Sequence, residues 1–150
     1  MERTNAHQPL HPAQRMKKLI LSSDYTPRPV VYISGPISGS GNLYENINRG
    51  IVWWDQMIED GLAPICPHMN DFGYIMQGRK PDWATALGCD LPLVIRSDAL
   101  FRIPGVSDGA DLEEWYAHRN NVPVFHDYDK LLPYCHGLKL WEGHGEGVTC

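Results

Sequence analysis

Four short apolar runs alternate with longer segments of helical periodicity, and this alternation restricts the fold more than any other feature of the sequence. The first run is bounded by Pro29 and by Gly35-Pro36, which is typical of a buried strand. Short strands separated by helices predict βαβ units, with a parallel sheet and helices on both of its faces. The sequence therefore predicts a single-domain α/β fold of the flavodoxin or Rossmann-like type. The four predicted strands are residues 30–34, 62–66, 99–102 and 122–125.

The segments between the runs carry apolar residues at helical spacing. In residues 44–60 they recur at steps of three and four, and Gly61 is placed to end this helix. A second helix begins with Asp82 as its cap and contains Pro92, which is expected to kink or restart it. Its inward residues are predicted to be Trp83, Leu87 and Leu91. A helix over residues 110–120 and a last helical turn over residues 127–132 complete the predicted elements.

Three segments lack a pattern that supports a regular element. Residues 1–29 are polar and contain four prolines, so they predict a flexible or peripheral extension with at most a short helical turn at residues 15–21. Residues 68–79 are irregular and predict a loop that crosses the top of the domain. Residues 133–150 contain four glycines and predict a tail. The folded domain is therefore expected to cover residues 30–132.

Composition limits the classes of partner. The chain has 150 residues, a formal net charge of −5 and no apolar run of transmembrane length, so neither polymeric nucleic acid nor a membrane is an expected partner. The first residues lack the apolar core of a signal peptide. Four cysteines occur without a CxxC pair or a zinc-like His/Cys spacing. This pattern predicts reduced thiols in a cytoplasmic protein and no metal site.

Two glycine-rich turns follow the first and third predicted strands. In a parallel sheet, ligands bind outside the carboxyl ends of the strands, where these two turns would meet. The first turn, residues 35–41, is neither a Walker A loop nor a dinucleotide fingerprint. Its N–H groups at Ile37, Ser38 and Gly39 could still bind a phosphate or a sugar oxygen. A tight strand-to-helix turn explains the same residues equally well.

The second turn, residues 105–109, leads into a helix that carries Glu113 near its start. Ser107 stands six positions before this glutamate, and a turn beside a helix N-terminus favours an anion. The simpler interpretation is that Ser107 or Asp108 caps the helix and that Glu113 is a solvated acid of the first turns. Asp90 and Tyr32 have equally simple interpretations, as a helix-cap acid and as a core side chain.

Four motifs occur in an order that resembles a known superfamily. They are residues 31–39, VYISGPISG; Asp90-Leu91 with Ser97-Asp98-Ala99; residues 107–113, SDGADLE; and residues 123–125, PVF. This ordered set resembles the nucleoside 2-deoxyribosyltransferase-like superfamily. That group includes deoxyribosyltransferases, 2′-deoxynucleoside 5′-phosphate N-hydrolases and small phage and bacterial members. The resemblance covers residues 30–132.

The resemblance implies a role for each matching residue. Glu113 matches the nucleophile, Tyr32 the tyrosine that orients its carboxylate, and Asp90 the acid that protonates the departing base. Ser107 and the first glycine-rich loop match the groups that hold the 5′ end of the sugar. The substrate-binding residues expected from the two turns are Gly35, Ile37, Ser38, Gly39, Ser107 and Gly109.

The implied mechanism is attack of Glu113 on C1′ of a deoxyribose as the base leaves, through a covalent glycosyl-enzyme. Water as the second acceptor gives a hydrolase, and another base gives a transferase. The resembling transferases have an aspartate six positions before the nucleophile and the nucleotide hydrolases have a serine, so Ser107 favours a 5′-monophosphate. The hydrolase loop also carries arginines that residues 38–41 lack, and Arg79, Lys80 or Arg102 could supply that charge.

The expected function is hydrolysis of the N-glycosidic bond of a 2′-deoxynucleoside 5′-monophosphate, with no cofactor and no metal. The alternatives are a deoxyribosyltransferase that exchanges bases and a non-catalytic module that senses a nucleotide. Residues 69–76 could form a base pocket with Phe72 or Tyr74, although a lid packed on the core explains these aromatics as well. The expected partner is a small nucleotide or nucleoside. The resemblance also implies a homo-oligomer.

Overall fold

The computed structural model describes residues 10–22, 25–38, 41–79 and 82–138. The chain divides into two compact units, residues 28–140 and a smaller unit of residues 1–27 with 141–150. Within the smaller unit, helix α1 (Pro12–Ile20) begins at a capping box between His11 and Gln14. The helix starts earlier than the turn expected at residues 15–21. None of the helices in these described segments is both long and apolar enough to cross a membrane.

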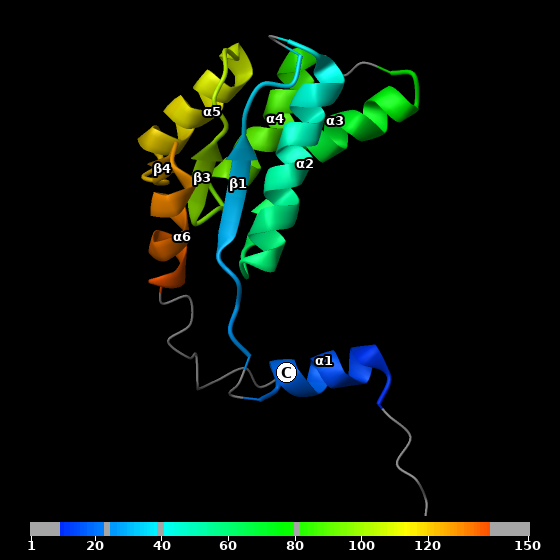
Figure 1. The fold of residues 1–150 in the computed structure, drawn as a ribbon, viewed down its shortest axis with the longest axis vertical. Helices are drawn as coiled ribbons and strands as arrows, with labels where there is room; N and C mark the ends of the chain where they lie inside the picture. Colours follow the sequence, from blue (N-terminus) through cyan, green and yellow to red (C-terminus); the bar gives the residue numbers. More distant parts are fainter. Residues whose placement is uncertain (1–9, 23–24, 39–40, 80–81, 139–150) are drawn as a thin grey trace, which may run out of the picture. The chain divides into compact units, whose positions relative to one another are not determined.

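A parallel sheet of four strands in the order β2-β1-β3-β4 forms the centre of the larger unit (Figure 1). Strand β1 is central, and its Tyr32 lies opposite Ile65 on one side and Leu100 on the other. The fold is the α/β, flavodoxin or Rossmann-like arrangement that the sequence predicts. Strands β1 and β3 have the predicted bounds, whereas β2 and β4 are shorter. The strands are β1 (Val30–Ser34), β2 (Ala63–Ile65), β3 (Ala99–Arg102) and β4 (Val124–Phe125).

The described residues of this unit form five helices, and the alternation of side chains along β1 separates two apolar layers. Val31 and Ile33 pack in one buried cluster with residues of α2 and α6. Tyr32 packs in a second cluster with Val94 of α4 and Ala117 of α5. Successive side chains of a strand point to opposite faces, so Ser34 shares the face of Tyr32. The helices are α2 (Leu43–Glu59), α3 (Pro67–Met76), α4 (Trp83–Val94), α5 (Asp108–Arg119) and α6 (Tyr128–His136).

The prediction of a loop at residues 68–79 is wrong, because helix α3 occupies most of this segment. Pro67 is its first residue, where the fixed φ of proline suits a helix and its missing N–H would have had no helical partner. His68 follows and is 1% exposed, and it packs against Gly50 of α2. Contact with α2, rather than a regular apolar period, therefore places this helix.

Three further predictions need correction. Helix α6 continues through Pro133 to His136, beyond the predicted end at residue 132, because Leu131 and Cys135 are one turn apart and both are buried. Helix α4 continues through Pro92 without a restart. Trp83 is 58% exposed and does not face the core, because it stands in the first turn of α4 beside a cavity.

The contact between α2 and α3 gives a stability prediction. A Cβ atom at Gly50 would lie 2.5 Å from Cγ of His68, which is buried and cannot move aside. Gly50→Ala is therefore expected to lower the free energy of unfolding by about 1–3 kcal/mol, although alanine has the higher helix propensity. Urea unfolding of the purified chain measures this change.

Gly88→Ala is the matched control, because a Cβ atom at this position of α4 meets nothing within 4 Å. It is expected to raise the free energy of unfolding by roughly 0.5–1 kcal/mol. An equal increase in the free energy of unfolding for Gly50→Ala and Gly88→Ala would contradict the tight packing of α3 on α2.

Candidate active site

The carboxyl of Glu113 lies at the centre of the candidate site. Glu113 is 7% exposed on the face of α5 that meets the sheet. Its Oε1 accepts a hydrogen bond from Tyr32 Oη at 2.7 Å, and its Oε2 accepts one from Ser34 Oγ at 2.6 Å. Both donors stand on β1, two residues apart, so one strand face fixes both carboxylate oxygens. The solvated position that the simpler interpretation gave to Glu113 is therefore wrong.

Burial and hydrogen bonding act in opposite directions on the proton of Glu113. Burial raises its pKa from 4.5 to about 7, and the charge of Asp90 adds to this shift. The hydroxyls of Ser34 and Tyr32 oppose it, because they donate to the ionised form, and the Arg102 charge does the same. Tyr32 itself keeps its proton, because burial and the nearby carboxyls raise its pKa well above 10. The result is a carboxyl that is held in place and lies close to half ionisation at neutral pH.

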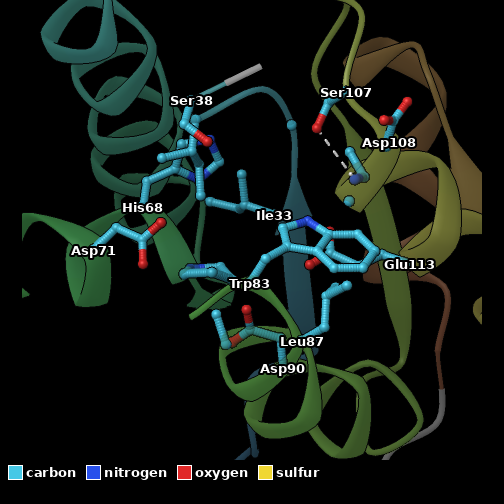
Figure 2. A pocket seen from close by; sticks show the side chains of 16 residues that line it. Ile33, Ser38, His68, Asp71, Trp83, Leu87, Asp90, Ser107, Asp108 and Glu113 are labelled. Carbon is cyan, nitrogen blue, oxygen red and sulfur yellow. Dashed lines mark hydrogen bonds between the residues drawn. The ribbon is translucent and has the colours of Figure 1, made fainter. Parts of the chain in front are cut away.

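Glu113 faces a cavity of about 280 Å³ at the carboxyl end of the sheet. Figure 2 shows side chains from β1, the loop after it, α3, α4 and the start of α5 around the cavity. Tyr32 does not line the cavity and contacts the site through its hydrogen bond to Glu113. Gly39 lies outside the described residues. The predicted site residues that line the cavity are Gly35, Ile37, Ser38, Asp90, Ser107, Gly109 and Glu113.

The two glycine-rich turns are in contact, as their positions after β1 and β3 predict. A Cβ atom at Gly35 would lie 2.8 Å from Cβ of Ile103. A Cβ atom at Gly105 would lie 2.5 Å from Cγ of Pro36, and Gly105 has a φ of 139°, which disfavours any other residue. Close approach of the two turns therefore depends on both glycines.

Arg102 fixes the second turn from inside the protein. Its side chain is buried, and Nη2 donates to Gly105 O at 3.1 Å and to Asp111 Oδ1 at 2.7 Å. Nη1 donates to Ile103 O at 2.8 Å. Because these bonds occupy the guanidinium and it does not line the cavity, Arg102 does not supply the charge considered for a phosphate. Arg79 lines a second, neighbouring cavity, and Lys80 lies outside the described residues.

Ser107 is the N-cap of α5, and its Oγ accepts a hydrogen bond from Ala110 N at 3.2 Å. The capping interpretation is therefore correct for this serine, which also lines the cavity. Among the residues that the structure describes, no acceptor bonds the N–H groups of Asp108 and Gly109. These groups and the positive end of the helix dipole make this edge of the cavity suitable for an anion.

Asp90 lies inside α4 on the opposite wall, so it is not the helix-cap acid of the simpler interpretation. It is half-buried, and burial together with the charge of Asp71 raises its pKa from 3.8 to about 6. The electrostatic effect of Asp90 also reaches Glu113 and Tyr32. The site thus brings together the three residues that the resemblance implies for catalysis.

Sequence reasoning did not assign four of the residues that shape this site. Ser34 was predictable, because it lies two positions after Tyr32 on a strand and must share its face. His68 and Asp71 fell in the segment predicted as a loop, and Trp83 was assigned to the core. Burial lowers the pKa of His68 to about 4, so its ring is neutral beside the cavity.

No group of three or more His, Cys, Asp or Glu residues within the described ranges is arranged to hold a metal ion. Comparisons of the sequence with protein-family models and with curated proteins found no match. The chemistry that the site can perform therefore follows from the positions of its own side chains. A fixed, buried carboxylate opposite a second carboxyl of raised pKa has the parts of a nucleophile and a general acid.

The burial of Glu113 predicts a pH-dependent loss of stability. Its pKa is higher in the folded chain (about 7) than the 4.5 of a free glutamate, so its contribution is fully present below the lower value and is lost as the pH rises through the higher one. The loss reaches about 3 kcal/mol at roughly pH 8. Glu113→Gln removes the ionisation and is expected to unfold at higher urea than the wild type at that pH.

At about pH 5, Glu113 is mostly protonated, so the two proteins are expected to have similar urea midpoints there. Asp55→Asn is the control, because Asp55 is an exposed acid on α2 that lines neither cavity. A Glu113→Gln variant that is less stable than the wild type at both pH values would contradict this account of the carboxyl.

Proposed function

We propose that this chain hydrolyses the N-glycosidic bond of a 2′-deoxynucleoside 5′-monophosphate, with Glu113 as the nucleophile. The observation that carries the proposal is the pair of hydroxyl donors, Tyr32 and Ser34, that hold a 7% exposed glutamate at the wall of a cavity. A carboxylate needed only for helix capping or solubility has no reason to be buried, because burial of a charge is costly. The sequence resemblance assigns the same residue independently.

In the proposed reaction, Glu113 attacks C1′ of the deoxyribose while the bond from C1′ to the base nitrogen breaks. The electron pair of that bond goes to the base, and Asp90 gives the base a proton. Water then attacks C1′ of the glycosyl-enzyme, returns Glu113 as a carboxylate and leaves its proton on Asp90. The products are a free base and deoxyribose 5-phosphate. The hydroxyls of Tyr32 and Ser34 keep the attacking carboxylate in one orientation throughout.

The 5′-phosphate would bind at the start of α5. The N–H groups of Asp108 and Gly109 and the dipole of the helix favour an anion there, and Ser107 adds a hydroxyl instead of the carboxylate of the resembling transferases. The cavity is small, so the base would extend beyond it on the side of Asp90. Membership of the superfamily, a cytoplasmic location and a homo-oligomer belong to the same proposal, and sedimentation of the purified chain tests the last.

One observation favours a second candidate, a deoxyribosyltransferase that takes an uncharged nucleoside. The described residues that line the cavity include four acids and neither a lysine nor an arginine. An anionic 5′ end must therefore overcome repulsion that a 5′-hydroxyl does not meet. The acids are Asp71, Asp90, Asp108 and Glu113.

The proposal predicts release of free base from at least one of dAMP, dCMP, dGMP and dTMP, measured by liquid chromatography. Glu113→Gln is expected to lower kcat by at least about a thousandfold, because the covalent step is lost while the cavity keeps its shape. Asp55→Asn, which is remote from the cavity, is the control for expression and folding.

Deoxynucleosides tested with and without a second free base separate the two candidates. A transferase gives an exchanged nucleoside and depends on the added base, whereas a hydrolase releases base without it. Wild type and Glu113→Gln that are equally inert on every nucleotide and nucleoside would overturn both. Thermal stabilisation by a nucleotide that is never cleaved would then identify a sensing module.

A further inference from the structure

Asp71 of α3 faces the candidate site from the segment that the sequence predicted as a loop. Its half-buried carboxyl lines the same cavity as Asp90 (Figure 2). A second cavity of about 530 Å³ adjoins the first, between α3 and α4. The two cavities share three lining residues, Asp71, Ala86 and Asp90. The two carboxyls therefore both border both cavities, at the boundary between them.

Neither carboxyl has a hydrogen-bond or ion-pair partner within the part of the chain that the structure describes. The groups that act electrostatically with Asp90 are Asp71 from α3, Glu113 from α5 and Tyr32 from β1. These are two acids and a phenol. Arg79 lines the second cavity, but among the described residues it forms no ion pair with either carboxyl and is not a cause of either pKa shift. The other titratable groups on the walls are His68, Tyr74, Arg79, Cys89 and Asp108.

Two neighbouring, partly buried carboxyls that lack ion-pair partners cannot both ionise cheaply, and the usual result is that the pair keeps one proton over a wider pH range than either acid would alone. Burial raises the pKa of Asp71, and burial and the charge of Asp71 raise the pKa of Asp90. The arrangement thus differs from a surface pair of acids, where water screens both charges.

We propose that Asp71 and Asp90 form an acid dyad that holds one proton at the junction of the two cavities, with Asp71 as the positioning residue that keeps Asp90 able to donate it. This inference rests on the proposed function, in which Asp90 protonates the departing base. Asp71 itself forms no bond with the reacting carbon. Its negative charge holds the proton on its neighbour until the base nitrogen takes the electron pair and the proton.

The dyad matters because the pKa values of Glu113 and Asp90 are in the wrong order for the proposed reaction. The reaction needs Glu113 ionised and Asp90 protonated, yet the pKa of Glu113 is about 7 and that of Asp90 is about 6. Only a minority of molecules is in the reactive protonation state at any pH. A further fall in the pKa of Asp90 reduces that minority directly.

Asp71→Asn tests the dyad through the pH dependence of kcat/KM. At about pH 4 and below, Asp90 is mostly protonated with or without its neighbour, so the variant is expected to approach wild-type activity there. At about pH 8, the rate follows the fraction of protonated Asp90, and loss of about one pKa unit lowers kcat/KM about tenfold. A loss of the same size at every pH would overturn the proposal, because a purely structural role has that effect.

Two further variants complete the experiment. Asp71→Glu keeps the negative charge and is expected to recover much of the activity at high pH. Asp55→Asn removes an exposed carboxylate from α2 and is expected to leave the pH profile unchanged. Failure of Asp71→Glu to recover more activity than Asp71→Asn would contradict a role for the charge.

A second measurement does not need activity. The carboxyl ¹³C shift of Asp90, followed by NMR against pH, is expected to titrate about one pH unit lower in Asp71→Asn than in the wild type. An unchanged midpoint overturns the dyad, even where hydrolysis is observed. A lowered midpoint in a chain that cleaves no substrate retains the dyad and removes the proposed function instead.

Discussion

The buried carboxyl of Glu113, held by the hydroxyls of Tyr32 and Ser34, is the interaction on which the rest of the site depends. A carboxylate at 7% exposure is stable only where donors replace the water that it loses, and both oxygens receive one here at 2.7 and 2.6 Å. The replacement is incomplete, because the pKa still rises to about 7. The fold thus keeps an acid that is easily neutralised, at a position where a neutral core residue would be more stable.

The parallel sheet makes this arrangement possible. Strand β1 is bonded on both sides, so its backbone is fixed and its two hydroxyl side chains point to the same face at a set spacing. Strand β3 ends beside it, and the turn that follows is locked by buried Arg102 and by the contact of Gly105 with Pro36. The position of α5, and with it Glu113, therefore depends on side chains that have little freedom, the buried and hydrogen-bonded Arg102 and the ring of Pro36.

The parts of the fold that could be predicted are those in which a local sequence pattern, such as an apolar run or a capping residue, is enough to determine the element. Strands β1 and β3 are apolar runs with clear ends, and the capping residue Asp82 begins α4 as expected. Helix α3 could not be predicted in this way, because contact of His68 with α2 places it and the chain carries no regular apolar period there.

The residues of the site fall into the same two groups, those with a local sequence signal and those placed only by the fold. Glu113, Asp90 and Tyr32 could be selected because they stand in motifs whose order resembles a known superfamily. Asp71 could not, because its significance comes only from its place beside Asp90 on the walls of the two cavities. Trp83 shows the opposite error, since an apolar residue at helical spacing was assigned to the core and instead borders the cavity.

The charge of the cavity has a consequence for any glycosidic reaction there. Four acids line it, and the described lining includes neither lysine nor arginine. An oxocarbenium-like transition state is positive at the sugar, so carboxylates stabilise it more than they stabilise the neutral sugar of the substrate. The same charges repel a 5′-phosphate in the ground state. In the proposed reaction, binding of such an anion would therefore have to come from the N–H groups at the start of α5, which would place the phosphate away from Asp71 and Asp90 and direct the sugar toward Glu113.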